Sequence, residues 1–93
     1  MGMSALERQL QLQDLPNIST VIARKLRQAG VNTPEQLFAM GSKEAFQRIK
    51  LLDPTACLNM LYAIEGAVQG IRWHYLDVEV KSGLKAFFTA LNQ

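Results

Sequence analysis

The chain has 93 residues, of which 48% are hydrophobic and 19% are charged, and this composition predicts one compact soluble domain around a single core. Ten basic and eight acidic residues give a net charge of +2, which neither requires nor opposes a nucleic-acid partner. The chain has one cysteine and one histidine, which excludes an internal disulfide and a zinc site built from Cys and His. It has no apolar run of about 18 residues, which excludes a membrane span, and from its first residues we expect no secretory signal.

The first twenty residues predict a short helix followed by a turn. Ser4-Ala5-Leu6-Glu7 has the spacing of a capping box, and we expect a helix from there to about Leu12. In the segment Leu15-Pro16-Asn17-Ile18-Ser19, the proline disfavours helical angles for the residue before it, and the asparagine tolerates left-handed angles. These five residues predict a tight turn that leads into the next helix.

A basic amphipathic helix is predicted next, capped by Ser19 or Thr20 and ended by Gly30. Its apolar residues recur at helical spacing along one side: Ile18, Ile22, Leu26 and Ala29. Its cationic residues lie off that side: Arg24, Lys25 and Arg27. A third helix is expected from Thr33 to Met40, because threonine is a good N-cap, proline follows it in the first helical position, and Gly41 is a stop signal.

The second half of the chain predicts three more helices. Ser42 is expected to cap the first of them, which carries Ala45, Phe46 and Ile49. Asp53-Pro54 repeats the signal of a cap followed by proline, so we expect a helix from Thr55 to Gly70 that is apolar on most sides and therefore central. Asp77 is expected to cap the last helix, whose apolar residues share one face: Val80, Leu84, Phe87, Phe88 and Leu91.

No segment alternates apolar and polar residues over several positions with β-branched side chains, the pattern typical of a strand. We therefore predict an all-α fold, a compact bundle of five or six helices. No nucleotide-binding loop or nucleophile-elbow motif is present, and we expect neither a cofactor nor enzymatic activity.

The segment from Leu15 to Leu37 is similar to a helix-hairpin-helix module, in which backbone amides at a helix N-terminus hold a DNA phosphate. Asn17 and Ser19 occupy the two positions that are usually glycine, and Val21 occupies a position that is often basic. The likeness implies the hairpin geometry, while the affinity of this hairpin for DNA stays open.

Five blocks of sequence, taken with their spacing, are more specific than the hairpin. They are Leu15-Pro16-Asn17-Ile18, Ala29-Gly30-Val31, Gly41 with Glu44-Ala45, the run Leu-Asn-Met-Leu-Tyr-Ala-Ile-Glu-Gly-Ala at 58–67, and Gly70-Ile71-Arg72-Trp73. In these blocks the chain closely resembles the C-terminal domain of the TfoX/Sxy family. The likeness spans residues 13–88 of a single domain at 1–93, with 1–12 as an N-terminal helix or tail, and fuller members carry a separate N-terminal domain.

Members of this family are bacterial regulators of natural transformation. The resemblance implies a non-enzymatic, cytoplasmic regulator of competence that acts with the transcription machinery and the cyclic-AMP receptor protein at promoters, without a membrane partner. Duplex DNA, held by its phosphates without sequence preference, is the further partner that the hairpin implies. The alternative is a protein-interaction or dimerisation module that binds no DNA, and the oligomeric state stays open.

If DNA binds, we expect it at the turn and the basic helix, through Asn17, Ile18, Ser19, Thr20, Arg24, Lys25 and Arg27. Residues 1–50 contain seven basic and four acidic side chains, against three and four in residues 51–93, so positive charge gathers in this half. Each cation bound to a phosphate would add to the salt dependence of binding. The alternative is a solvated helix face without a ligand.

Three other features have both a functional and a structural interpretation, and the structural one is favoured for each. Glu65 is expected to pair with an arginine or a helix-end amide, next to a glycine that permits close helix packing. Trp73 is expected to anchor its connector by burial with His74 exposed, the alternative being that these rings and Tyr75 stack on a base. Cys57 is expected to be a small buried hydrophobe.

Overall fold

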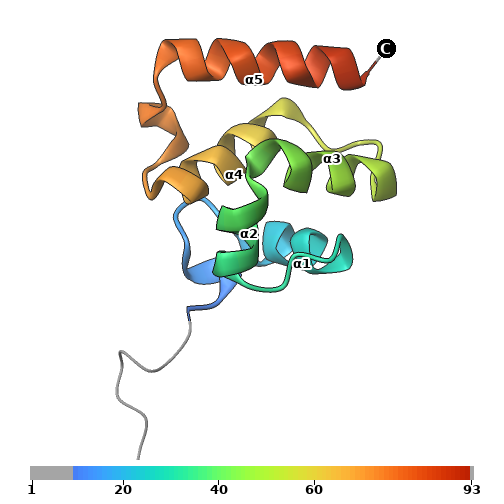
Figure 1. The fold of residues 1–93 in the computed structure, drawn as a ribbon, viewed down its shortest axis with the longest axis vertical. Helices are drawn as coiled ribbons and strands as arrows, with labels where there is room; N and C mark the ends of the chain where they lie inside the picture. The colour runs from blue at the N-terminus through green and yellow to red at the C-terminus, as the bar shows by residue number, and fades with distance from the viewer. Residues whose placement is uncertain (1–9, 93) are drawn as a thin grey trace, which may run out of the picture.

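The structure, a computed structural model, describes residues 10–92, which form five α-helices and two short 3-10 turns with no strand (Figure 1). The elements in chain order are η1 (Leu12–Asp14), α1 (Thr20–Gln28), α2 (Pro34–Met40), α3 (Ser42–Leu52), α4 (Leu58–Gln69), η2 (Trp73–Tyr75) and α5 (Val78–Leu91). The predicted all-α class is confirmed. The helix expected over residues 4–12 falls mostly outside the described residues, and residues 10 and 11 are not helical.

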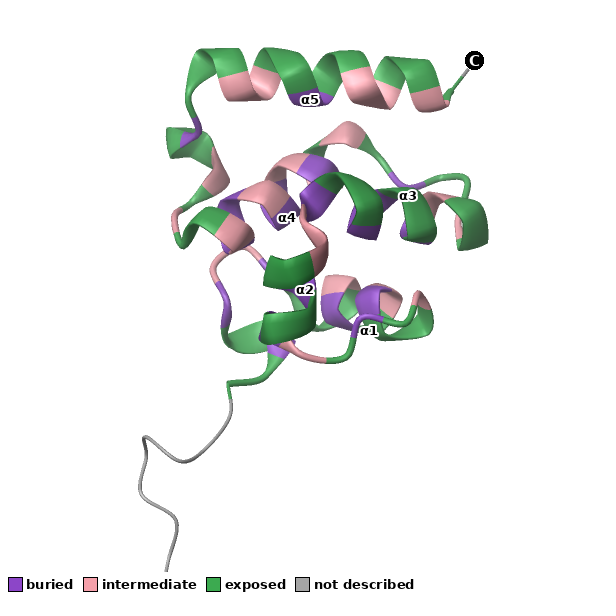
Figure 2. Ribbon diagram, viewed as in Figure 1, coloured by how far each residue is buried: buried purple, intermediate pink, exposed green. Residues whose placement is uncertain are grey.

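Helix α4 lies at the centre, where it packs against α3, α5 and η2, while α1 and α2 pack on α3. In Figure 1, α5 lies along one side, α3 and α4 form the middle, and α1, α2 and η1 lie on the other side. The buried residues, purple in Figure 2, face inward and include the bulky Phe46, Leu26, Ile49, Leu61 and Ile64. Among the helices of residues 10–92, none has the length and apolar character that a membrane crossing requires.

Local capping chemistry sets most of the helix starts where the sequence predicted them. The Ser19 hydroxyl accepts the amide of Ile22 at 3.2 Å, and the Thr33 hydroxyl accepts the amide of Gln36 at 3.1 Å. Asp77 accepts the amide of Glu79 at 3.0 Å at the start of α5. Gly41, with a φ of 87°, ends α2 and precedes α3, a backbone angle that residues with a side chain rarely adopt.

Two predicted helix starts are wrong. Ser42 is the first residue of α3 and not its cap, since its buried hydroxyl donates a hydrogen bond to Glu65 of α4 instead. Helix α4 begins at Leu58 rather than Thr55, because the Asp53 carboxylate accepts both the amide and the hydroxyl of Thr55 and closes a local turn. Cys57 consequently precedes α4 as an exposed N-cap residue, which corrects its expected burial.

The turn before α1 touches the connector after α4 through one side chain, that of Asn17. This residue has a φ of 69°, and its Nδ2 donates to the carbonyls of Ile71 (2.8 Å) and Ala63 (3.4 Å). Its Oδ1 accepts the amide of Trp73 at 3.1 Å. Gly66 provides the necessary space, because a Cβ built there would lie only 2.5 Å from Asn17 Nδ2 and 2.8 Å from the carbonyl oxygen of Ile71.

We expect Gly66→Ala to lower the free energy of unfolding by about 2 kcal/mol, because the added methyl group would collide with atoms that hydrogen bonds hold in place. Gly83→Ala in α5 is the matched control. A Cβ at Gly83 meets nothing within 4 Å, and alanine is the better helix former by about 1 kcal/mol, so this variant should be as stable as the wild type or more so. Urea denaturation measures both, and equal effects of the two substitutions would contradict the close approach at Gly66.

Candidate nucleic-acid interface at the turn before α1

Three of the seven predicted contact residues use their side chains to hold the fold. Asn17 bonds to the connector, and Ile18 is buried in the core. Ser19 caps α1 by accepting the amide of Ile22. At these positions only the backbone of the turn is free to bind a ligand. A helix-hairpin-helix module holds a phosphate through its backbone amides. The structure does not itself confirm that module.

The remaining four residues lie on α1 and differ in their surroundings. Thr20 and Arg24 are exposed and four positions apart, which places them on the same side of the helix. Lys25 forms an ion pair with Asp53, and Arg27 donates to the side chain of Gln13 at 2.8 Å. Neither Arg24 nor Arg27 forms an ion pair with any of residues 10–92, and of the two only Arg24 also lacks a side-chain hydrogen bond to those residues, so it is the more open to a ligand.

Arg72, which the sequence did not single out, lies at the same place. Together with Leu15–Ser19 it lines a hollow of about 490 Å³. The Asn17 bond to Ile71 brings the two segments together across 54 positions of sequence, so no local pattern could have revealed the pairing. Arg72 is exposed and, within the described part of the chain, forms no ion pair.

The hollow lies next to the N-terminal end of α1, because Ser19, the N-cap residue of that helix, is one of its lining residues. The amides of Thr20 and Val21 at the start of α1 form no hydrogen bond with the described residues, and the first turn of α1 contains no acidic residue. The positive end of the helix dipole is therefore not neutralised from within its own first turn. A helix N-terminus beside an arginine is an arrangement that favours an anion, and phosphate is an anion that helix N-termini commonly bind.

The connector that carries Arg72 is also an aromatic cluster. Trp73 is half-buried and stacks on Tyr62, with ring centroids 5.7 Å apart, and on His74 at 4.2 Å. Lys81 Nζ lies 5.4 Å from the centroid of the Trp73 ring. Trp73 anchors the connector as predicted, although its burial is partial, and both His74 and Tyr75 are exposed.

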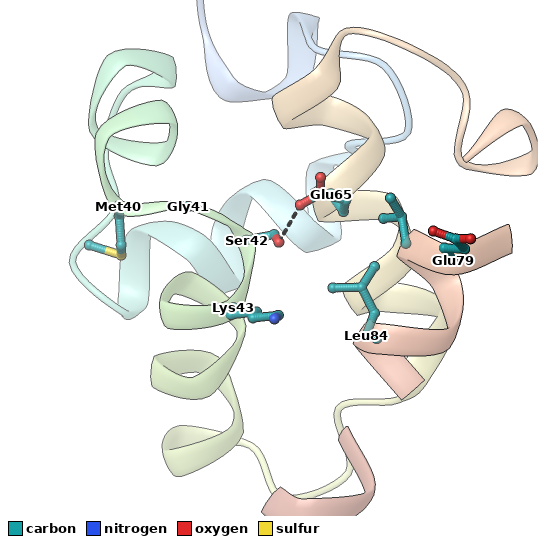
Figure 3. Close-up of a pocket in the computed structure, with 9 residues that line it drawn as sticks. Met40, Gly41, Ser42, Lys43, Glu65, Glu79 and Leu84 are labelled. Atoms are coloured by element: carbon teal, nitrogen blue, oxygen red, sulfur yellow. Dashed lines mark hydrogen bonds between the residues drawn. The ribbon is translucent and has the colours of Figure 1, made fainter. Parts of the chain in front are cut away.

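A second hollow, of about 560 Å³, lies where the start of α3 faces α4 and α5 (Figure 3). Ser42 donates to one carboxylate oxygen of Glu65 at 2.5 Å, and Gln69 donates to the other at 2.7 Å. The expected partner of Glu65, an arginine or a helix-end amide, is thus wrong, and the carboxylate ties α3 to α4 through a hydroxyl. Within residues 10–92, no three His, Cys, Asp or Glu side chains come together as metal ligands would.

The chain is similar to one protein family and, among solved structures, to two from Listeria monocytogenes. The model of the TfoX C-terminal domain matches residues 8–88. A structure of an uncharacterized protein from Listeria monocytogenes, in a triclinic form, is 51% identical, with a TM-score of 0.88 over 89% of this chain and 94% of that one. A protein of unknown function from Listeria monocytogenes, in a tetragonal form, is 52% identical, with a TM-score of 0.84 over 85% and 98%. None of the curated proteins compared matches the chain.

The ion pair at Lys25 makes stability depend on pH. Hydrogen bonds from Lys25 and then from Thr55 lower the pKa of Asp53 from 3.8 to about 2. Because the pKa of Asp53 is lower in the folded state than in the unfolded state, these interactions of the Asp53 carboxylate stabilise the fold fully above about pH 4. Their contribution is lost as the pH falls toward about 2.

We expect Lys25→Met to be less stable than the wild type near neutral pH, and the difference in the free energy of unfolding to shrink between about pH 4 and pH 2. Arg24→Met, which removes a neighbouring charge without an ion pair, is the control, and its difference from the wild type should vary less over this range. Urea denaturation at a series of pH values gives both curves. A Lys25→Met difference that stays constant down to pH 2 would show that Asp53 titrates independently of Lys25.

Proposed function

Because the chain belongs to the TfoX C-terminal domain family, we propose that it is a non-enzymatic regulator of bacterial competence that acts in the cytoplasm by contact with DNA and with transcription proteins. Membership of this family suggests a competence-related role. The observation that carries the mechanism is the hollow that Arg72 and the turn line together, since the turn includes Ser19, the N-cap residue of α1.

The DNA contact in this proposal is to phosphate and not to bases. Backbone amides and an arginine at the rim of a hollow bind a phosphate in the same way whatever the sequence of the strand. Arg24, one helical turn along from Thr20, extends the positive surface along α1. Lys25 contributes less than the sequence predicted, because Asp53 neutralises it.

The family resemblance suggests the protein partners in this proposal, which are the transcription machinery or the cyclic-AMP receptor protein. A domain that binds DNA phosphates weakly and without sequence preference would be held at a promoter by the protein beside it, and its own DNA contact would strengthen the assembly.

An alternative function is supported by a different surface, the end of α3. Leu51 and Leu52 are adjacent there and are 80% and 61% exposed. Exposed leucines at such a site fit a protein-interaction or dimerisation module that binds no DNA. Binding to duplex DNA separates the two functions.

We expect the protein to retain a short duplex of arbitrary sequence at low salt and to release it as salt rises, measured by fluorescence anisotropy. Arg72→Ala should weaken binding about three- to tenfold and reduce the slope of log K against log salt by about 1, since one phosphate contact is lost. Arg24→Ala should act in the same direction.

Lys85→Ala is the matched control, because it removes an exposed cation from α5, on the other side of the middle helices from α1 (Figure 1). Its effect should be smaller than that of Arg72→Ala. Absence of duplex binding by the wild type at low salt, or equal losses in the Arg72 and Lys85 variants, would reject the DNA contact and favour the interaction module.

A further inference from the structure

Two exposed aromatic side chains, His74 and Tyr75, lie in the η2 turn, two and three positions after Arg72. Tyr75 is 76% exposed, and His74 before it is also exposed. The amide of Tyr75 donates to the carbonyl of Arg72 at 2.9 Å, so the tyrosine lies one 3-10 turn from the arginine that borders the hollow. A cationic hollow and exposed aromatic rings thus share one short piece of backbone.

This piece of backbone is fixed on several sides. Asn17 holds the carbonyl of Ile71 and the amide of Trp73, and the Trp73 ring stacks on Tyr62 of α4. Leu76, which follows Tyr75, is buried in the core. The exposed rings are therefore presented by a rigid support, which reduces the entropy lost when a ligand stacks on them.

We propose that this surface binds an unpaired nucleotide strand, with a phosphate in the hollow beside Arg72 and a neighbouring base stacked on Tyr75. The phosphate contact is the one in the proposed function, on which this inference rests. Paired bases in a duplex are stacked on one another and offer no free face to a protein ring, whereas bases of a single strand do. The surface therefore discriminates between strand types, which the phosphate contact alone does not.

A protein partner is the competing occupant, because tyrosine is common at protein interfaces. The nucleotide strand is favoured because Tyr75 lies one 3-10 turn from Arg72, which lines a hollow without an acidic lining residue. Two acidic residues are near in sequence, Asp77 to Tyr75 and Asp14 to the hollow, and each carboxylate accepts a backbone amide, from Glu79 and from Gln11 respectively. A strand presents the two required groups, an anion and a flat ring, at regular intervals.

The experiment compares the binding of three labelled probes to the full chain by fluorescence anisotropy at one low salt concentration: a 12-nucleotide oligo(dT), an oligo(U) of the same length and a 12-base-pair duplex. We expect at least one of the single strands to bind more tightly than the duplex. Tyr75→Ala should weaken binding of that strand about tenfold and leave duplex binding unchanged. Tyr75→Phe, which keeps the ring, should bind like the wild type.

Val78→Ala is the control, since Val78 is exposed to a similar degree and lies three residues further on without an aromatic ring. Both substitutions are at exposed positions, so neither should unfold the protein. Preference for oligo(dT) or oligo(U) identifies the strand as DNA or RNA, and either supports the proposal.

Equal affinity for single strand and duplex, together with no effect of Tyr75→Ala, would overturn this inference and leave the proposed function intact. Failure of all three probes to bind would overturn both and leave the exposed tyrosine to a protein partner.

Discussion

The side chain of Asn17 joins two parts of the chain that lie 54 positions apart, and the candidate interface depends on this link. Its amide donates to the connector after α4 and its carbonyl oxygen accepts from it, so one residue satisfies three backbone groups of that connector and of α4. The left-handed angles of Asn17 shape the turn at the same point, and Gly66 leaves the space that the side chain fills. Asn17 is therefore the residue through which the turn is hydrogen-bonded to the connector that carries Arg72.

Local chemistry explains what the sequence predicted well. The caps at Ser19, Thr33 and Asp77 bind amides two or three positions further on, so their signals lie within one helical turn. The inner face of α5 follows from periodicity in the same way. Ser42 and Asp53 show the limit of such signals, because Ser42 donates to the distant Glu65, and Asp53 binds both the nearby Thr55 and the distant Lys25.

The candidate site was predicted only in part, because contacts between residues distant in sequence complete it. The turn and the basic helix are visible in the sequence, but which cations remain open depends on distant partners. Asp53 neutralises Lys25, whereas Arg24 on the same helix has no such partner within the described residues. Arg72 could not be placed at the turn from spacing alone, because four helices, α1 to α4, separate it in sequence from Asn17, whose contact brings it there. The partner of Glu65 was missed for the same reason.

Native-state hydrogen exchange of the Trp73 amide tests the role of Asn17 most directly. If Asn17 holds the connector against the turn, this amide exchanges in the wild type nearly as slowly as the core amides of α4, and much faster in Asn17→Gly, which allows the same backbone angles without the side chain. A Trp73 amide that exchanges in the wild type as rapidly as one in an unfolded peptide, or at the same slow rate in both proteins, would contradict that role.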